Sequence, residues 1–471
     1  MNGSLPSAAT LAEDHRARRR DPRETIRSAL ERIEARQGDL NAFATIDAAG
    51  ATKRANELAL AIEGSSDPGP LAGVPVSVKD ILDVAGLPTR WGSRLMADAK
   101  PALADVAAVA RLRAAGAVIL GKTTTSEFAH SPLGVAPLTG VTRNPWAPDV
   151  TCGGSSAGAG VSVAAGLTPI ALATDAGCST RLPAACTGVF GLKPTLGRVP
   201  HDRVPEAFGN FIHLGLMGAY VRDLALALDV VAGGQRDDPH SLFQPLPNAT
   251  RELDASGLDG ARVIVWTQTG NARVGEEVLA ATRKAAAVLQ SLGALVVEEP
   301  YRFAHPDPIW RTLQQSNWAS RFAAATSEQR AQLSPTLVAG IDAGLSYRGL
   351  DLQRALVKRT ELFRGIQEAF AERAHFILTP CASAPPVHAE HELTAPLVVD
   401  GVEVGDLRAE WTPYLSLFDL SGHPAIAMPA GRAESGAPLG VQLVTAWGHD
   451  AKLLAAAAAY EAAIQPPRPG S

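Results

Sequence analysis

Cysteines, aromatic residues and an excess of positive charge are all scarce in this chain of 471 residues. Four cysteines in so long a sequence, none of them in a CxxC pair, exclude a disulfide framework. A formal net charge of -5 argues against a general nucleic-acid binder, whose affinity depends on basic patches. No run reaches about 18 uninterrupted apolar residues, so we expect no membrane span.

The N-terminal residues also predict no secretory leader. The first residues, MNGSLPSAATLAEDH, contain no positively charged segment followed by an apolar run. We therefore expect a cytoplasmic protein.

Apolar spacing divides the chain into alternating helices and short strands. Helical patterns occur at 23–36, 51–62, 103–115, 274–292, 351–372 and 450–464. Short apolar runs typical of buried strands occur at 73–78, 117–120, 169–174, 262–266, 375–379, 425–428 and 440–444. This alternation predicts an α/β fold with a covered sheet. We expect residues 1–20 to form an N-terminal extension and residues 21–466 to form a single domain.

Two motif matches do not fit their usual structural context. GAVILGKT at 116–123 has the P-loop pattern, but its middle residues Ala-Val-Ile-Leu favour a buried strand over a phosphate-binding loop. GSSAG at 154–158 has the nucleophile-elbow pattern, yet two prolines in NPWAPDVTC make the preceding segment a poor strand. His388, Glu390 and His391 lack the spacing of a metal site, so we expect neither a metal nor a cofactor.

Three other segments form a consistent set. They are GVPVSVKD (73–80), TCGGSSAGAG (151–160) and ATDAGCSTRLPAACTGVFGLKPT (173–195). Together they resemble the amidase signature family, in which a Gly/Ser-rich segment carries a cis serine and G-T-D-x-G-G-S-[IV]-R-x-P-A carries the nucleophile. Here Ser155 and Ser179 stand 24 positions apart, as in the family, and Lys79 precedes Ser155 by some 75 positions.

The resemblance covers most of the chain, from about residue 20 to about residue 465. It includes LRAAGAVILGKTTTSEFA (112–129), FILTP (376–380), LSGHPAIAMPAG (420–431) and PLGVQLV (438–444). It implies a large mixed central β-sheet flanked by helices on both faces. It also implies a signature core at about 73–200 and a variable substrate-pocket region at about 201–375.

The chemistry of these residue types agrees with the resemblance. A serine hydroxyl becomes a good nucleophile when a base takes its proton, and lysine is a base only when burial lowers its pKa. A second serine can accept one proton while it donates another. The resemblance therefore implies Ser179 as nucleophile, Ser155 as proton bridge and Lys79 as general base.

The resemblance also assigns the residues around the nucleophile. The backbone amides of Ala176, Gly177 and Cys178 are expected to form the oxyanion hole, which binds the negatively charged oxygen of the tetrahedral intermediate. Cys178 departs from the family, which usually has glycine there, and it would exclude most conformations with positive φ. As an alternative nucleophile, Cys178 lies outside the serine–lysine spacing. The expected supporting residues are Gly154, Ser156, Asp175 and Arg181.

Apolar residues in the variable segments predict the kind of substrate. The residues expected to line the pocket are Phe128, Leu133, Gly134, Val135, Trp146, Phe208, Phe211 and Trp318. They favour neutral secondary or aryl amides, with carbamates (urethanes) also plausible. The alternatives are a partner-dependent amidotransferase-type subunit that releases ammonia from glutamine, and a specialist for primary amides or carboxybiuret. A homodimer stays open, because no interface is visible in the sequence.

Overall fold

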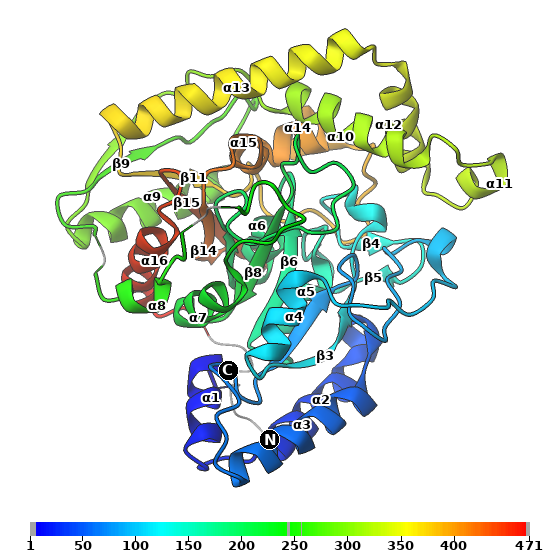
Figure 1. Ribbon diagram of the computed structural model, residues 1–471. Helices are drawn as coiled ribbons and strands as arrows, with labels where there is room; N and C mark the ends of the chain where they lie inside the picture. The colour runs from blue at the N-terminus through cyan, green and yellow to red at the C-terminus, as the bar shows by residue number, and fades with distance from the viewer. Residues whose placement is uncertain (1–5, 243–244, 256, 468–471) are drawn as a thin grey trace.

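A computed structural model describes residues 6–242, 245–255 and 257–467 (Figure 1). Within these ranges one eleven-stranded sheet forms the centre of the molecule. In spatial order its strands are β1 (Phe43–Ile46), β3 (Val118–Thr123), β2 (Pro75–Lys79), β6 (Ile170–Asp175), β8 (His213–Gly218), β7 (Phe190–Lys193), β14 (Ala425–Arg432), β15 (Pro438–Thr445), β11 (Phe376–Pro380), β9 (Arg262–Val265) and β10 (Leu295–Glu298).

The sheet is mixed, as expected. The strands β3, β2 and β6 are parallel to one another, and so are β11, β9 and β10. The strands between these two groups pair antiparallel. Every residue of β2, β3 and β6 is buried, which is the pattern expected of parallel strands covered on both faces. Two small hairpins, β4 (Val135–Ala136) with β5 (Gly140–Val141) and β12 (Pro396–Val399) with β13 (Val402–Asp406), complete the strands of the described residues.

Helices cover the sheet and extend beyond it. In the described residues they are α1 (Ala8–Arg16), α2 (Pro22–Leu40), α3 (Ala48–Glu63), α4 (Ala107–Ala114), α5 (Ala157–Ala164), α6 (Arg181–Thr187), α7 (Val221–Val231), α8 (Ala249–Glu252), α9 (Glu276–Ser291), α10 (Asp307–Phe322), α11 (Ser327–Arg330), α12 (Pro335–Ser346), α13 (Gly349–Glu372), α14 (Leu407–Trp411), α15 (Pro413–Ser421) and α16 (Asp450–Ile464). The long α13 lies at the opposite end of the molecule from α1, α2 and α3 (Figure 1). Within the part described, none of these helices is long and apolar enough to cross a membrane.

All the predicted helices and strands are confirmed. The helices correspond to α2, α3, α4, α9, α13 and α16, and the strands to β2, β3, β6, β9, β11, β14 and β15. In particular, the P-loop-like segment forms β3, as its apolar middle residues predict. The division of the chain at residue 20 stays a prediction. Residues 1–5 lie outside the described residues, and α1 packs on α7, where the Ala8 and Ala9 amides donate to Asp223.

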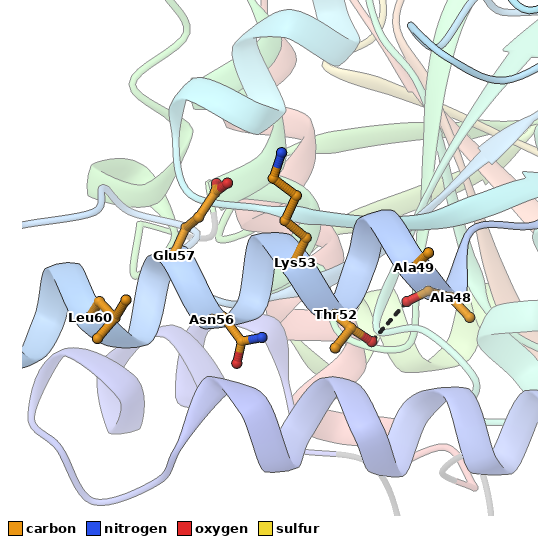
Figure 2. Close-up of a pocket in the computed structure, with 7 residues that line it drawn as sticks. All are labelled: Ala48, Ala49, Thr52, Lys53, Asn56, Glu57 and Leu60. Carbon is orange, nitrogen blue, oxygen red and sulfur yellow. Dashed lines mark hydrogen bonds between the residues drawn. The ribbon is translucent and has the colours of Figure 1, made fainter.

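A shallow hollow on the surface runs along one face of α3 (Figure 2). Its lining residues lie between Ala48 and Leu60, and Lys53 and Glu57 are the charged ones. None of the predicted site residues lines this hollow. The predicted catalytic residues lie instead at and beyond the ends of the central strands.

Candidate active site

Two neighbouring parallel strands bring the predicted catalytic segments to one edge of the sheet. Lys79 is the last residue of β2, and Asp175 is the last residue of β6, which pairs with β2. Since parallel strands end at the same edge, the loops that follow β2 and β6 lie side by side. The Gly/Ser-rich segment leads into α5, which packs on β6 and β2.

The Lys79 side chain is fully buried and touches one of the predicted serines. Its Nζ donates to Ser155 Oγ at 2.7 Å and to Thr174 Oγ1 at 2.9 Å. Burial lowers the pKa of Lys79 from 10.5 to about 7, against the opposing effects of Asp175 and Cys178. A large fraction of this amine is therefore uncharged at neutral pH, and an uncharged amine can accept a proton.

The loop that carries Ser155 is held by backbone contacts. The Gly154–Ser155 peptide bond is cis, as the resemblance implies, and the Ser155 carbonyl accepts from the Ser126 amide at 3.2 Å. A Cβ on Gly154 would lie 2.5 Å from the Leu133 carbonyl oxygen, so only glycine fits there. The next residue, Ser156, donates from its amide to the Ser179 carbonyl at 3.2 Å. The loop is thus fixed against the turn that contains Ser179.

Ser179 lies in the turn between β6 and α6, and 8% of it is exposed. Asp175 organises this turn, because its carboxylate accepts from the Ser179 amide at 2.7 Å and from the Thr180 and Arg181 amides at 3.1 and 3.2 Å. Within the described residues the Ser179 hydroxyl has no protein hydrogen-bond partner. This hydroxyl is therefore free to meet a ligand.

The three amides predicted to form the oxyanion hole precede the three amides that donate to Asp175. In the part of the chain described, the amides of Ala176, Gly177 and Cys178 donate to no protein acceptor. Neither Gly177 nor Cys178 has a positive φ, so cysteine replaces the usual glycine without backbone strain. Three adjacent amides beside a serine hydroxyl are the donors that an oxyanion needs.

The Cys178 thiol is not placed as a nucleophile. It is buried and donates to the Gly154 carbonyl oxygen at 3.6 Å. Burial raises the pKa of Cys178 from 9.0 to about 12, so the thiol stays protonated at neutral pH.

A buried ionic network supports the Ser179 turn from behind. The Arg181 guanidinium donates to Asp175 at 2.8 Å, to Asp419 at 2.6 Å and to the Gln442 side-chain oxygen at 2.9 Å. Burial alone would raise the pKa of Asp175, but Arg181 outweighs it and the pKa is lowered. Burial raises the pKa of Asp419 well above its ordinary range. The ionised Asp175 is therefore compensated by Arg181.

We expect Arg181→Met to destabilise the fold strongly. Removing one partner of a buried ion pair leaves an uncompensated charge and costs about 3–5 kcal/mol. Urea unfolding would measure this loss. Arg27→Met is the matched control, because Arg27 pairs with Glu31 at 2.8 Å on the surface, and such pairs contribute only about 0.3–0.5 kcal/mol. Equal losses from the two variants would contradict the structural role of the network.

Three predicted pocket residues pack in the hydrophobic cluster that Ala176 contacts, and three others lie on the loop that adjoins Gly154. Phe128, Phe211 and Trp318 belong to one hydrophobic cluster of aromatic and aliphatic side chains, called the aromatic cluster below, and Ala176 packs against it. The amide of Leu133 donates to the Ser131 hydroxyl, and its carbonyl adjoins Gly154. Gly134 and Val135 follow directly on this loop, and Val135 begins the short strand β4.

Two predicted pocket residues lie elsewhere. Trp146 donates to the Thr187 carbonyl and stacks under the Arg432 guanidinium, 4.0 Å from its ring, at a separate cavity of about 430 Å³. Phe208 is 83% exposed. The structure does not bring these two side chains together with Ser179.

Four residues of the site were not predicted from the sequence. They are Thr174, Asp419, Gln442 and Trp310, whose indole Nε1 donates to the Ala176 carbonyl at 2.7 Å. Thr174 and Gln442 stand inside the motif segments, so only their roles were missed. Trp310 lies in the variable region, where no motif marks it.

The segment that contains His388, Glu390 and His391 forms an ion pair and a local hydrogen bond. Glu390 pairs with Arg143 at 2.8 Å, and its amide donates to His388 Nδ1. Across the described ranges, no cluster of three or more His, Cys, Asp or Glu is placed to hold a metal ion.

Comparisons with known proteins agree with this geometry. A family model described as Amidase matches residues 24–454. An acylamidase from Rhodococcus erythropolis is 31% identical over 458 residues, covering 97% of this chain and 95% of its own. A glutamyl-tRNA(Gln) amidotransferase subunit from Synechococcus sp. (strain RCC307) is also 31% identical, covering 94% of each chain.

Solved structures with the same architecture include two hydrolases. A bacterial aryl acylamidase of the amidase signature enzymes superposes with a TM-score of 0.91 at 30% identity, covering 98% of this chain and 96% of its own. A 6-aminohexanoate cyclic dimer hydrolase complexed with substrate gives 0.84 at 27% identity, covering 97% of each chain.

Proposed function

Since this chain belongs to the amidase signature family, hydrolases that act on C–N amide bonds, we propose that it is a stand-alone hydrolase of neutral secondary or aryl amides. The observation that carries the proposal is the buried contact of 2.7 Å between Lys79 Nζ and Ser155 Oγ, next to the turn that presents Ser179. No cofactor enters the proposed reaction.

The proposed reaction begins with proton transfer along the two serines. Uncharged Lys79 takes the proton of Ser155, while Ser155 takes the proton of Ser179, whose oxygen attacks the amide carbonyl carbon. Thr174 accepts one N–H of Lys79, which helps to aim the lone pair of the amine at Ser155. Hydrogen bonding between the two serine hydroxyls is expected once substrate excludes solvent from Ser179.

A negative charge then develops on the carbonyl oxygen. Hydrogen bonds from the amides of Ala176, Gly177 and Cys178 stabilise this charge. The proton held by Lys79 returns through Ser155 to the leaving amine, and the C–N bond breaks. The product remaining on the enzyme is an acyl ester of Ser179. Water, activated by the same lysine and serine, hydrolyses this ester and restores the free enzyme.

The aromatic cluster supports the choice of substrate. Phe128 stacks on Trp91 with ring centroids 5.8 Å apart and meets Phe322 edge-on at 4.9 Å. Ala176 of the oxyanion turn packs against the hydrophobic cluster that contains Phe128, Phe322 and Trp310, and such apolar surroundings would suit an aryl group or an apolar acyl chain. An aryl carbamate presents a carbonyl to Ser179 in the same way, so carbamates stay within the proposal.

The proposal is tested by arylamine release from an uncharged acyl anilide with the purified chain alone. We expect the anilide to exceed the primary amide of the same acyl group by about tenfold or more in kcat/KM, because burying an aryl ring contributes about 1.5–3 kcal/mol. An aryl carbamate with the same ring would then measure the preference between amide and carbamate. A preference for the primary amide would overturn the proposed substrate class.

The likeness to the amidotransferase subunit supports one alternative, release of ammonia from glutamine with a partner chain. That alternative predicts no anilide hydrolysis by the chain alone and ammonia release only with a second chain. Turnover of the anilide without a partner would reject it.

A further inference from the structure

We infer that Trp310 of α10 is a positioning residue, which aims the Gly177 amide at the oxyanion. The inference rests on the proposed function, because it takes Ser179 as the nucleophile and the neighbouring amides as its oxyanion hole. It adds a residue from outside the signature motifs, more than 130 positions from the turn that it controls.

The peptide unit that joins Ala176 to Gly177 is planar, and Trp310 binds its carbonyl oxygen. Trp310 Nε1 donates to the Ala176 carbonyl oxygen at 2.7 Å. In a planar trans peptide the carbonyl and the N–H of the same unit point in opposite directions. Fixing the Ala176 oxygen against the indole therefore turns the Gly177 N–H to the opposite side. The same hydrogen bond polarises the peptide and strengthens its N–H as a donor.

The indole itself is held in place on several sides. Trp310 is only 5% exposed, and Trp318 meets its ring edge-on, with centroids 6.1 Å apart. The Arg408 guanidinium lies over the ring, 4.3 Å from its centroid, and donates to the His130 carbonyl at 2.6 Å. His130 in turn meets Trp318 edge-on at 6.3 Å. A ring so confined can fix the direction of the carbonyl that it holds.

The close approach of the indole also explains why residue 177 is glycine. A Cβ on Gly177 would lie 2.8 Å from Trp310 Nε1, closer than real Cβ contacts allow. The φ of Gly177 is not positive, so backbone conformation alone does not require glycine. The requirement comes from Trp310.

This contact links the substrate pocket to the chemistry. The ring of Trp310 belongs to the aromatic cluster proposed to hold the substrate, and its Nε1 holds the oxyanion turn. Because only 5% of Trp310 is exposed, its influence on the reaction would act through the turn that it holds rather than through direct contact with substrate. Trp310 should accordingly influence kcat more than KM.

Trp310→Phe tests the inference, because phenylalanine keeps a ring and loses the donor. We expect kcat for the anilide to fall about five- to tenfold, with KM changed less than about twofold, since one hydrogen bond is lost. Trp146→Phe is the matched control: it also removes an indole donor, whose Nε1 donates to the Thr187 carbonyl at 2.7 Å, but at the separate cavity away from Ser179. Its kcat should stay within about twofold. Equal losses of kcat in the two variants, or a loss confined to KM, would overturn the inference.

Two further measurements separate positioning from simple packing. A trifluoromethyl ketone forms a tetrahedral adduct with serine, and its affinity should fall in Trp310→Phe by the same factor as kcat/KM. In a protein that keeps Trp310, Gly177→Ala should reduce activity strongly, because the added methyl group meets the indole. In a Trp310→Ala background the methyl group has room, and the same substitution should reduce activity far less. Additive effects of these substitutions would contradict the contact. Activity that survives Ser179→Ala would instead reject the proposed function, whatever the Trp310 variants show.

Discussion

Ser179→Ala is expected to lower kcat/KM for an acyl anilide by roughly 10⁴-fold or more, because the acyl ester cannot form without the hydroxyl. The fold should be unaffected, since the Ser179 hydroxyl has no protein hydrogen bond in the described chain and its amide remains with Asp175. Arylamine release and thermal unfolding, measured on the same preparation, check the two parts of this prediction.

Ser156→Ala is the matched control for the proposed nucleophile, Ser179. The Ser156 hydroxyl is buried close to Ser179, but it donates only to the Thr174 carbonyl at 3.3 Å. We expect its removal to cost less than about tenfold in kcat/KM, as for a single neutral hydrogen bond. A Ser156 variant as inactive as the Ser179 variant would mean that the serines have been given the wrong roles.

Lys79→Met is expected to lower kcat/KM at neutral pH by about 10³-fold, since general base catalysis contributes about 10²–10⁴. In the unsubstituted enzyme kcat/KM should rise with pH and level off above about 7, because burial lowers the pKa of Lys79 to about 7 and only the uncharged amine accepts a proton. The residual activity of the variant should lack this rise. A pH profile of kcat/KM for both proteins is the measurement.

Lys193→Met is the matched control for Lys79→Met. Burial also lowers the pKa of Lys193 to about 7, but its Nζ donates to the His423 and Pro194 carbonyls and, among the described residues, to no serine. The Lys193 variant should therefore keep the rise in kcat/KM near pH 7. If this variant loses the rise and Lys79→Met keeps it, Lys79 is not the base.

The same lowered pKa has a consequence for stability. The unfolded chain binds the lysine proton up to a pH of about 10.5, whereas the folded chain releases it above about 7. Between these values the unfolded state holds more protons, so the Lys79 contribution makes folding more favourable as the pH rises. Lys79→Met removes this pH-dependent contribution. The free energy of unfolding of the variant, compared with that of the unsubstituted protein at the same pH, should therefore be raised most below pH 7.

The sequence predicted the regular elements of the central sheet because their apolar patterns are local. The run GVPVSV and the run PIALAT identify the strands β2 and β6, and the motif spacing then places Lys79 and Asp175 at their ends. The cis bond before Ser155 was expected from the resemblance. These features depend on residues that are near one another in the chain.

The rest of the site depends on contacts that no local pattern encodes. Trp310 reaches Ala176 across 134 positions, and Arg181 reaches Gln442 across 261. Aromatic side chains are common in pockets, so composition predicts Trp146 and Phe208 as pocket residues, but it does not say which way a side chain faces. Arg432 and Thr187 hold Trp146 at a different cavity.

The hydrogen bonds of Arg181 to Asp419 and Gln442 also have a consequence during synthesis of the protein. A nascent chain contains Lys79, Ser155 and Ser179 long before residues 419 and 442 have been translated. Until then, Arg181 lacks two of its three side-chain partners, and β7 lacks its neighbour β14 in the sheet. The Ser179 turn is thus completed by α15 and β15, and hydrolytic activity should arise only after residues 419–442 have been translated.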